Sequence, residues 1–169
     1  YIAEHHEQPA VFFQLLIPVG NFDVAVGKKG LASMAVDMLS KGTKNYVADE
    51  LSEAIEFTGG SLSATSGNEY TTITGRFLKE DFITGLELMS DMLLHPTFPE
   101  NEWKLLKKQT QEGIKSWYSD AGTVAQAHLT KLAFGDTPAG NMMTKNTLKK
   151  ITLDDAKDFY SNLRPDNAV

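Results

Sequence analysis

The 169-residue chain contains no cysteine, so neither a disulfide framework nor a thiolate metal site can form. It also has no apolar run close to the roughly 20 residues that a membrane-spanning helix requires, and no block of like charge. The formal net charge is -6, which argues against nucleic acid or an anionic membrane as the main partner. The hydrophobic fraction of 41% is sufficient for one domain with a sizeable core.

The chain is organised around residues 30–43, where apolar side chains recur at the spacing of an amphipathic helix. These positions fall at i, i+3, i+4, i+7 and i+8, and they are Leu31, Met34, Ala35, Met38 and Leu39. The spacing predicts a helix with this face on a core. Gly42 is predicted to end it, because glycine adopts the left-handed conformation of a helix stop at little cost.

The opposite face of this helix is predicted to be exposed and to carry Ser33, Val36, Asp37 and Ser40. Positions 33 and 37 are one turn apart and point the same way. This is the geometry by which an H-x-x-E-H helix presents two metal-binding histidines, with the glutamate between them as general base.

Residues 30–43 resemble the G-L-A-H-x-x-E-H-M-L-x-K-G-T signature of the pitrilysin/insulinase-type zinc peptidases, whose relatives include mitochondrial processing peptidase. Eight positions match as they stand: Gly30, Leu31, Ala32, Met38, Leu39, Lys41, Gly42 and Thr43. The positions of the two histidines and the glutamate hold Ser33, Asp37 and Val36. The resemblance therefore implies that the scaffold of the motif is retained and its zinc chemistry is lost.

The third zinc ligand of the family is a glutamate on a later helix, and the alignment puts Gly113 at that position. Glu112 is its neighbour, about 100° round the helix, and a one-residue gap in the alignment would put Glu112 at the ligand position. Asp37 and Glu112 are thus the remaining weak metal candidates, and two carboxylates without imidazoles make a poor zinc site. The resemblance implies no catalytic residue and no cofactor in this chain, with zinc only in an active partner.

The remaining pattern predicts a strand over 10–20, covered on both faces or buried at an edge, and a hairpin of strands over 61–66 and 69–77. Further helices are predicted over 47–58, 82–93, 99–117, 123–134 and 152–163, with a Gly/Pro/Asn-rich loop over 135–145. The elements do not alternate as βαβ. The predicted fold class is therefore α+β, with helices on one face of a mainly antiparallel sheet.

Three other segments resemble family landmarks in the expected order, at residues 59–64, 95–99 and 163–169. Subunits of the family contain two such α+β domains, and a final strand follows the last landmark. The resemblance implies that residues 1–169 are a first domain, cut before its closing strand, and that a second similar domain lies beyond the chain.

Other chemistry finds little support in the sequence. His5 and His6 are adjacent and would point to opposite faces of a strand, and His95 suits a helix C-terminus without any metal. His128 is predicted to be a core or boundary residue, because it shares a helix stripe with Val124 and Leu132. Ser33 lies in no G-x-S-x-G elbow, and the glycine-rich segments lack the lysine spacing of a phosphate loop.

The resemblance leaves three functions open. The first is a non-catalytic subunit or domain that forms a substrate chamber with an active H-x-x-E-H subunit or sister domain, with a peptide as possible substrate. The second is a purely structural role, like that of the core subunits of respiratory complex III. The third and weakest is an active zinc metalloendopeptidase with a remodelled site. The family favours a bacterial periplasmic location, with the mitochondrial matrix or cytoplasm as alternatives.

Overall fold

The computed structural model describes residues 9–163 and 168, and its centre is a three-stranded antiparallel sheet. The strands are β1 (Ala10–Ile17), β2 (Ser61–Ser66) and β3 (Thr71–Leu78), in the spatial order β1-β3-β2. β2 and β3 form the predicted hairpin, with Ala64 opposite Ile73. His5 and His6 lie outside the described residues, as does the family landmark over 163–169 apart from Leu163 and Ala168.

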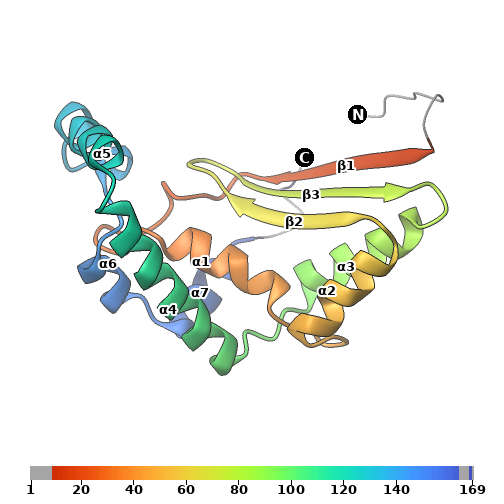
Figure 1. Cartoon of the computed structure of the whole chain (residues 1–169). Helices are drawn as coiled ribbons and strands as arrows, with labels where there is room; N and C mark the ends of the chain where they lie inside the picture. The colour runs from red at the N-terminus through yellow and green to blue at the C-terminus, as the bar shows by residue number, and fades with distance from the viewer. Residues whose placement is uncertain (1–8, 164–167, 169) are drawn as a thin grey trace.

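Seven helices are found in the part of the chain that the structure describes. They are α1 (Leu31–Asp37), α2 (Ala48–Phe57), α3 (Phe82–Leu94), α4 (Glu100–Trp117), α5 (Ala121–Phe134), α6 (Lys145–Lys150) and α7 (Leu153–Tyr160). Figure 1 shows α1, α2, α3 and α7 below one face of the sheet, whereas α5 stands apart at one end. The predicted α+β class, with helices on one face of an antiparallel sheet, is confirmed.

The sheet has one buried face because side chains alternate along its strands. On β3 the odd-numbered positions are buried, namely Thr71, Ile73, Gly75 and Phe77, and the even-numbered ones are more exposed. On β1 the even-numbered Phe12 is 67% exposed and carries the Arg76 guanidinium 5.2 Å above its ring. Of the two predicted placements, coverage on both faces is wrong, because β1 lies at an edge of the sheet formed by the described residues and has one open face.

The packing of β1 on β3 depends on a glycine opposite an aromatic ring. Gly75 is the cross-strand partner of Phe13, and a Cβ at position 75 would lie inside the Phe13 ring. The Phe13 ring stacks on Phe77 with centroids 6.0 Å apart. The absence of a side chain at position 75 thus lets the ring lie flat against the sheet.

Helix α1 differs from the prediction in its length and in its exposed face. It ends at Asp37, and a 3₁₀ turn, η1 (Met38–Ser40), follows. Gly42 does not cap a helix, because Gly42 and Thr43 form β-bridges to Val47 and Pro96. The expected exposure of Val36 is wrong, since this side chain is 1% exposed and belongs to the core.

Two features beyond α4 also differ from the sequence-based expectations. The region between α5 and α7 contains a 3₁₀ turn, η2 (Pro138–Gly140), and helix α6 where little besides a loop was predicted. The Thr144 and Thr147 side chains cap the start of α6, and Leu148 is its one buried residue. No helix among residues 9–163 combines the length and apolar content needed to cross a bilayer.

Candidate functional site

The positions that correspond to the metal-binding histidines form a narrow polar stripe on α1. Ser33 is half-buried and Asp37 is exposed, one helical turn apart. Because α1 packs against β2 and α7, most of its other residues are buried, among them Leu31, Met34 and Val36. The stripe is thus the open side of a helix that is otherwise surrounded by the core.

The environment of Asp37 is less favourable to charge than open solvent. Desolvation by neighbouring atoms raises the pKa of its carboxyl group, and the positive charge of Lys41 acts in the opposite direction. The backbone carbonyl oxygen of Asp37 accepts a hydrogen bond of 3.1 Å from the Ser40 hydroxyl. Asp37 is thus an aspartate at the end of a helix beside a basic neighbour. Its contacts stabilise the helix end and involve no metal ligand.

Glu112, the second carboxylate candidate, is exposed on α4 and paired locally. Its Oε1 lies 2.6 Å from the Lys115 Nζ, and the hydrogen bond from Lys115 is the main cause that lowers the pKa of Glu112. The carboxylate is therefore held against its own helix by a residue three positions on. Nothing in the described contacts joins Glu112 to the α1 stripe.

Gly113, which the family resemblance aligns with the third ligand, opens onto a hollow. A Cβ at this position would meet no atom within 4 Å. The hollow has a volume of about 450 Å³ and lies between α4, α5 and the segment before α6. Its lining is mostly apolar: Thr110, Gly113, Ile114, Trp117, Ala127, Thr130, Asn141, Met142 and Met143.

This hollow extends towards the start of α1 through Met143. Gly30, the N-cap of α1, has φ +103°, a conformation that glycine adopts most readily. A Cβ on Gly30 would approach the Met143 sulfur to 2.3 Å. This contact could not be predicted from the helical periodicity, because the half-buried Met143 lies in the Gly/Pro/Asn-rich segment and packs against the edge of the core.

Zinc is the metal that the family signature implies, and the residues here do not fit it. The four signature positions supply one carboxylate, from Asp37, together with a serine, a core valine and a glycine. Within residues 9–163 and 168, no group of three or more His, Cys, Asp or Glu side chains is placed to hold a metal ion. Structural and catalytic zinc sites need at least three such protein ligands.

The two histidines among the described residues have separate surroundings. His95 is the C-cap of α3, as predicted for a helix terminus, and its Nδ1 lies 3.3 Å from Asp91 Oδ1. His128 is exposed on α5, and Leu132 beside it is 85% exposed. The predicted core or boundary position of His128 is wrong, because α5 has no buried face at all.

Sequence comparison places these observations in a family. The profile of the Insulinase (Peptidase family M16) family matches residues 1–147. The chain belongs to this family. The segment over 30–43, which resembles the zinc signature of the family, lies within the matched residues.

Two curated M16 relatives align over most of the chain. The "Non-peptidase homolog YmxG" of Helicobacter pylori is 28% identical over 162 residues, which are 95% of this chain and 38% of that protein. The "Uncharacterized zinc protease YmxG" of Bacillus subtilis is 29% identical over 143 residues, which are 83% of this chain and 35% of that protein. The chain thus spans little more than a third of the length of these relatives.

A solved structure supports the fold. The crystal structure of a peptidase M16 inactive domain from Pseudomonas fluorescens superposes with a TM-score of 0.88 at 21% identity. The match covers 94% of this chain and 39% of that one. The arrangement of an edge strand, a hairpin and one layer of helices is therefore that of an M16 domain.

Proposed function

We propose that this chain is a non-catalytic M16 domain that forms the wall of a peptide chamber together with an intact H-x-x-E-H copy. The observation that carries the proposal is the position of Val36. This residue stands where the signature has its general base, and its side chain is packed into the core at 1% exposure. A glutamate at this place needs solvent and a metal-bound water to act on, and an apolar core supplies neither.

The other signature positions support the same conclusion. Ser33 and Gly113 carry no side chain that coordinates zinc in ordinary sites, and the Asp37 carboxyl group stands without imidazole partners on α1. The names of two similar proteins point the same way, since one is called a non-peptidase homologue and the other an inactive domain. The retained Leu31, Met38 and Leu39 are buried, so selection for packing explains why the scaffold of the motif persists.

The proposal includes a second, similar α+β domain in the whole protein. Its support is length, because the curated relatives are more than twice as long as the matched region. A chamber formed by two-domain subunits would place this domain opposite the domain of a partner. The apolar hollow beside Gly113 would then be available as part of the inner wall.

Metal analysis of the purified full-length protein is the first test. We expect much less than one zinc per chain after dialysis, because the signature positions offer a single carboxylate. A matched pair of variants, Asp37→Ala and Glu112→Ala, should leave the zinc content unchanged. Stoichiometric zinc that is lost in Asp37→Ala, whether or not Glu112→Ala also loses it, would show a remodelled metal site, and the non-catalytic assignment would fall.

Reconstitution is the second test. The full-length protein is mixed with the product of a neighbouring gene that carries an intact H-x-x-E-H motif. Peptide cleavage is expected in the mixture and not with either protein alone, and a glutamate-to-glutamine change in the partner's motif should abolish it. Full activity of the neighbour alone, with no complex on size-exclusion chromatography, would reject the chamber role and favour a purely structural one.

A further inference from the structure

A second hollow lies between α4 and α6, and its walls are strongly basic. Its volume is about 380 Å³. Seven residues line it: Lys104, Lys107, Lys108, Gln111, Lys145, Leu148 and Lys149. Five of the 16 lysines and arginines of the chain therefore gather at one place, although the net charge of the chain is -6. We call this surface the lysine groove.

The fold builds the lysine groove from two helices that are distant in sequence. Residues 104, 107, 108 and 111 lie on consecutive turns of α4, and 145 and 149 are one turn apart on α6. Leu148 is 3% exposed and anchors α6 between them. The Lys107 Nζ donates a hydrogen bond of 2.6 Å to the backbone carbonyl of Ile151, which follows α6. This bond ties the two walls together.

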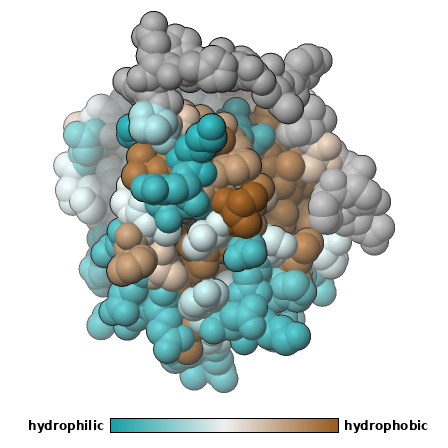
Figure 2. All heavy atoms as spheres, turned by 90° about the vertical axis from the view of Figure 1, so that its right-hand side faces the viewer, coloured by the Kyte–Doolittle hydropathy of each residue, from teal (hydrophilic) through white to brown (hydrophobic). Residues whose placement is uncertain are grey.

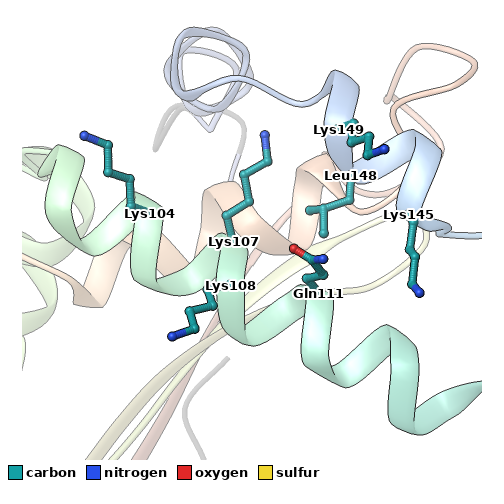
Figure 3. A pocket seen from close by; sticks show the side chains of 7 residues that line it. All are labelled: Lys104, Lys107, Lys108, Gln111, Lys145, Leu148 and Lys149. Atoms are coloured by element: carbon teal, nitrogen blue, oxygen red, sulfur yellow. The ribbon is translucent and has the colours of Figure 1, made fainter.

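The amines are spread along the groove instead of meeting at one point. Figure 3 shows Gln111 near Leu148 in the middle, Lys104 towards one end and Lys145 towards the other, with the ammonium groups fanned outward. From Lys104 to Gln111 the rise along α4 is roughly 10 Å, at 1.5 Å per residue. The positive charge thus follows a line and is not focused on a single anion.

Two acidic residues of α4 are paired with lysines of the same helix. Glu100 Oε1 is 2.8 Å from the Lys104 Nζ, and Glu112 pairs with Lys115. Lys108 and Lys145 also contribute to the lowered pKa of Glu112, so the positive charge of both helices that line the groove acts on this carboxylate. A carboxylate brought by a ligand would meet the same environment.

We propose that the lysine groove binds a short, extended, acidic peptide segment. Alternate side chains of an extended peptide are roughly 7 Å apart on one side, so two carboxylates fit along the roughly 10 Å of α4 that face the groove. The lysine stems offer apolar surface for the peptide between its charges. Gln111 adds an amide that donates to or accepts from the peptide backbone.

A phosphate group or a nucleic acid fits less well. Phosphate sites commonly converge backbone N–H groups of a glycine-rich turn or a helix start on one anion, whereas the groove presents dispersed amines from helix sides. A nucleic acid would extend far beyond the groove over a chain of net charge -6, which repels a long polyanion. A short peptide stays within about one Debye length, roughly 8 Å, of the lysines.

The test measures binding of a labelled peptide with alternating glutamate and alanine to the full-length protein by fluorescence anisotropy. The triple variant Lys108→Gln/Lys145→Gln/Lys149→Gln removes three exposed lysines of the groove. The matched control Lys44→Gln/Lys79→Gln/Lys157→Gln removes three exposed lysines that do not line it. Both variants have the same net charge, and circular dichroism verifies that both are folded.

We expect the wild-type protein and the control to bind the acidic peptide alike, and the groove variant to bind at least about tenfold more weakly. A peptide with glutamine in place of glutamate should not bind. If peptide binding is weakened equally in both variants, the lost affinity is due to net charge alone, and the proposal is overturned. Tighter binding of a single-stranded oligonucleotide than of the peptide, or displacement of the peptide by inorganic phosphate at equal concentration, would also overturn it.

Discussion

Thr43 donates a buried hydrogen bond to Asp91, although 48 residues separate them in the sequence. The Asp91 carboxylate also accepts a bond of 2.9 Å from the Asn45 side chain. The Thr43 hydroxyl in turn accepts bonds of 3.2 and 3.0 Å from the backbone N–H groups of Asn45 and Tyr46. The last residue of the family signature thus fastens the turn after α1 to α3, a function that needs no metal.

Replacement of Thr43 tests the structural role of this bond. Thr43→Val keeps the shape but removes the hydroxyl, so Asp91 loses a donor at 7% exposure. The free energy of unfolding should fall by about 1–3 kcal/mol, because Asp91 loses one of its donors and the N–H groups of Asn45 and Tyr46 lose their acceptor. Thr65→Val, on the exposed side of β2, should change it by less than about 0.5 kcal/mol. Equal denaturation midpoints for the two variants would contradict the role.

Val36 offers a test of which side of α1 is buried. Val36→Thr introduces a hydroxyl at a site with 1% exposure. The free energy of unfolding should therefore fall by about 1–3 kcal/mol. Met34→Ala is the reference for a buried side chain and should lower the free energy of unfolding by about 2–5 kcal/mol. Asp37→Ala should change it by no more than about 0.5 kcal/mol. A loss in Val36→Thr as small as that in Asp37→Ala would show that this face of α1 is open to solvent.

The ion pair between Lys28 and Asp155 predicts a dependence of stability on pH. The Lys28 Nζ lies 2.5 Å from Asp155 Oδ1, and Asp155 Oδ2 accepts from the Thr152 backbone N–H at 2.9 Å. Burial acts to raise the pKa of Asp155, but the hydrogen bonds from Lys28 and Thr152 outweigh it and hold the pKa below its usual value. The folded state therefore binds the Asp155 proton less tightly than the unfolded state does.

A depressed pKa contributes stability above the unfolded pKa of about 3.9 and loses it as the pH falls through the folded value. Asp155→Asn should therefore lower the free energy of unfolding at pH 7 by roughly 1–2 kcal/mol. The difference from the wild type should shrink below about pH 4. Asp154→Asn, which removes an exposed carboxylate in the same turn, is the matched control and should cost less. A difference that persists unchanged to pH 2 would exclude the ion pair as its cause.

Elements with a strong local signal could be predicted from the sequence. The hairpin has β-branched residues around Gly67 and Asn68, and the expected strands and the observed β2 and β3 agree closely. The predicted helix over 152–163 begins at a capping box of Thr152 and Asp155, with both reciprocal hydrogen bonds formed. In each case neighbours within a few residues determine the conformation.

The features that could not be predicted depend on contacts between distant segments. The face of Val36 was assigned from helical periodicity, which assumes one buried side, whereas β2 and α7 enclose α1 from two sides. α6 has six residues and one buried side chain, too short for a periodic pattern. The lysine groove escaped detection because no run of like charge exists in the sequence and its walls meet only in the folded chain.

The exposure of α5 determines how stable one wall of the hollow beside Gly113 is, because α5 forms that wall. None of the α5 residues is buried, and isolated helices of about 12–15 residues are marginal in water. α5 should therefore open locally at a small free energy, while the amides of α1 exchange with solvent only when the core unfolds. One wall of the hollow is then anchored in the cooperative core and the other belongs to a separate unit. The volume of the hollow therefore changes as α5 opens and closes. The apparent affinity for a ligand that fills the hollow would be reduced to the fraction of molecules in which α5 is folded against α4.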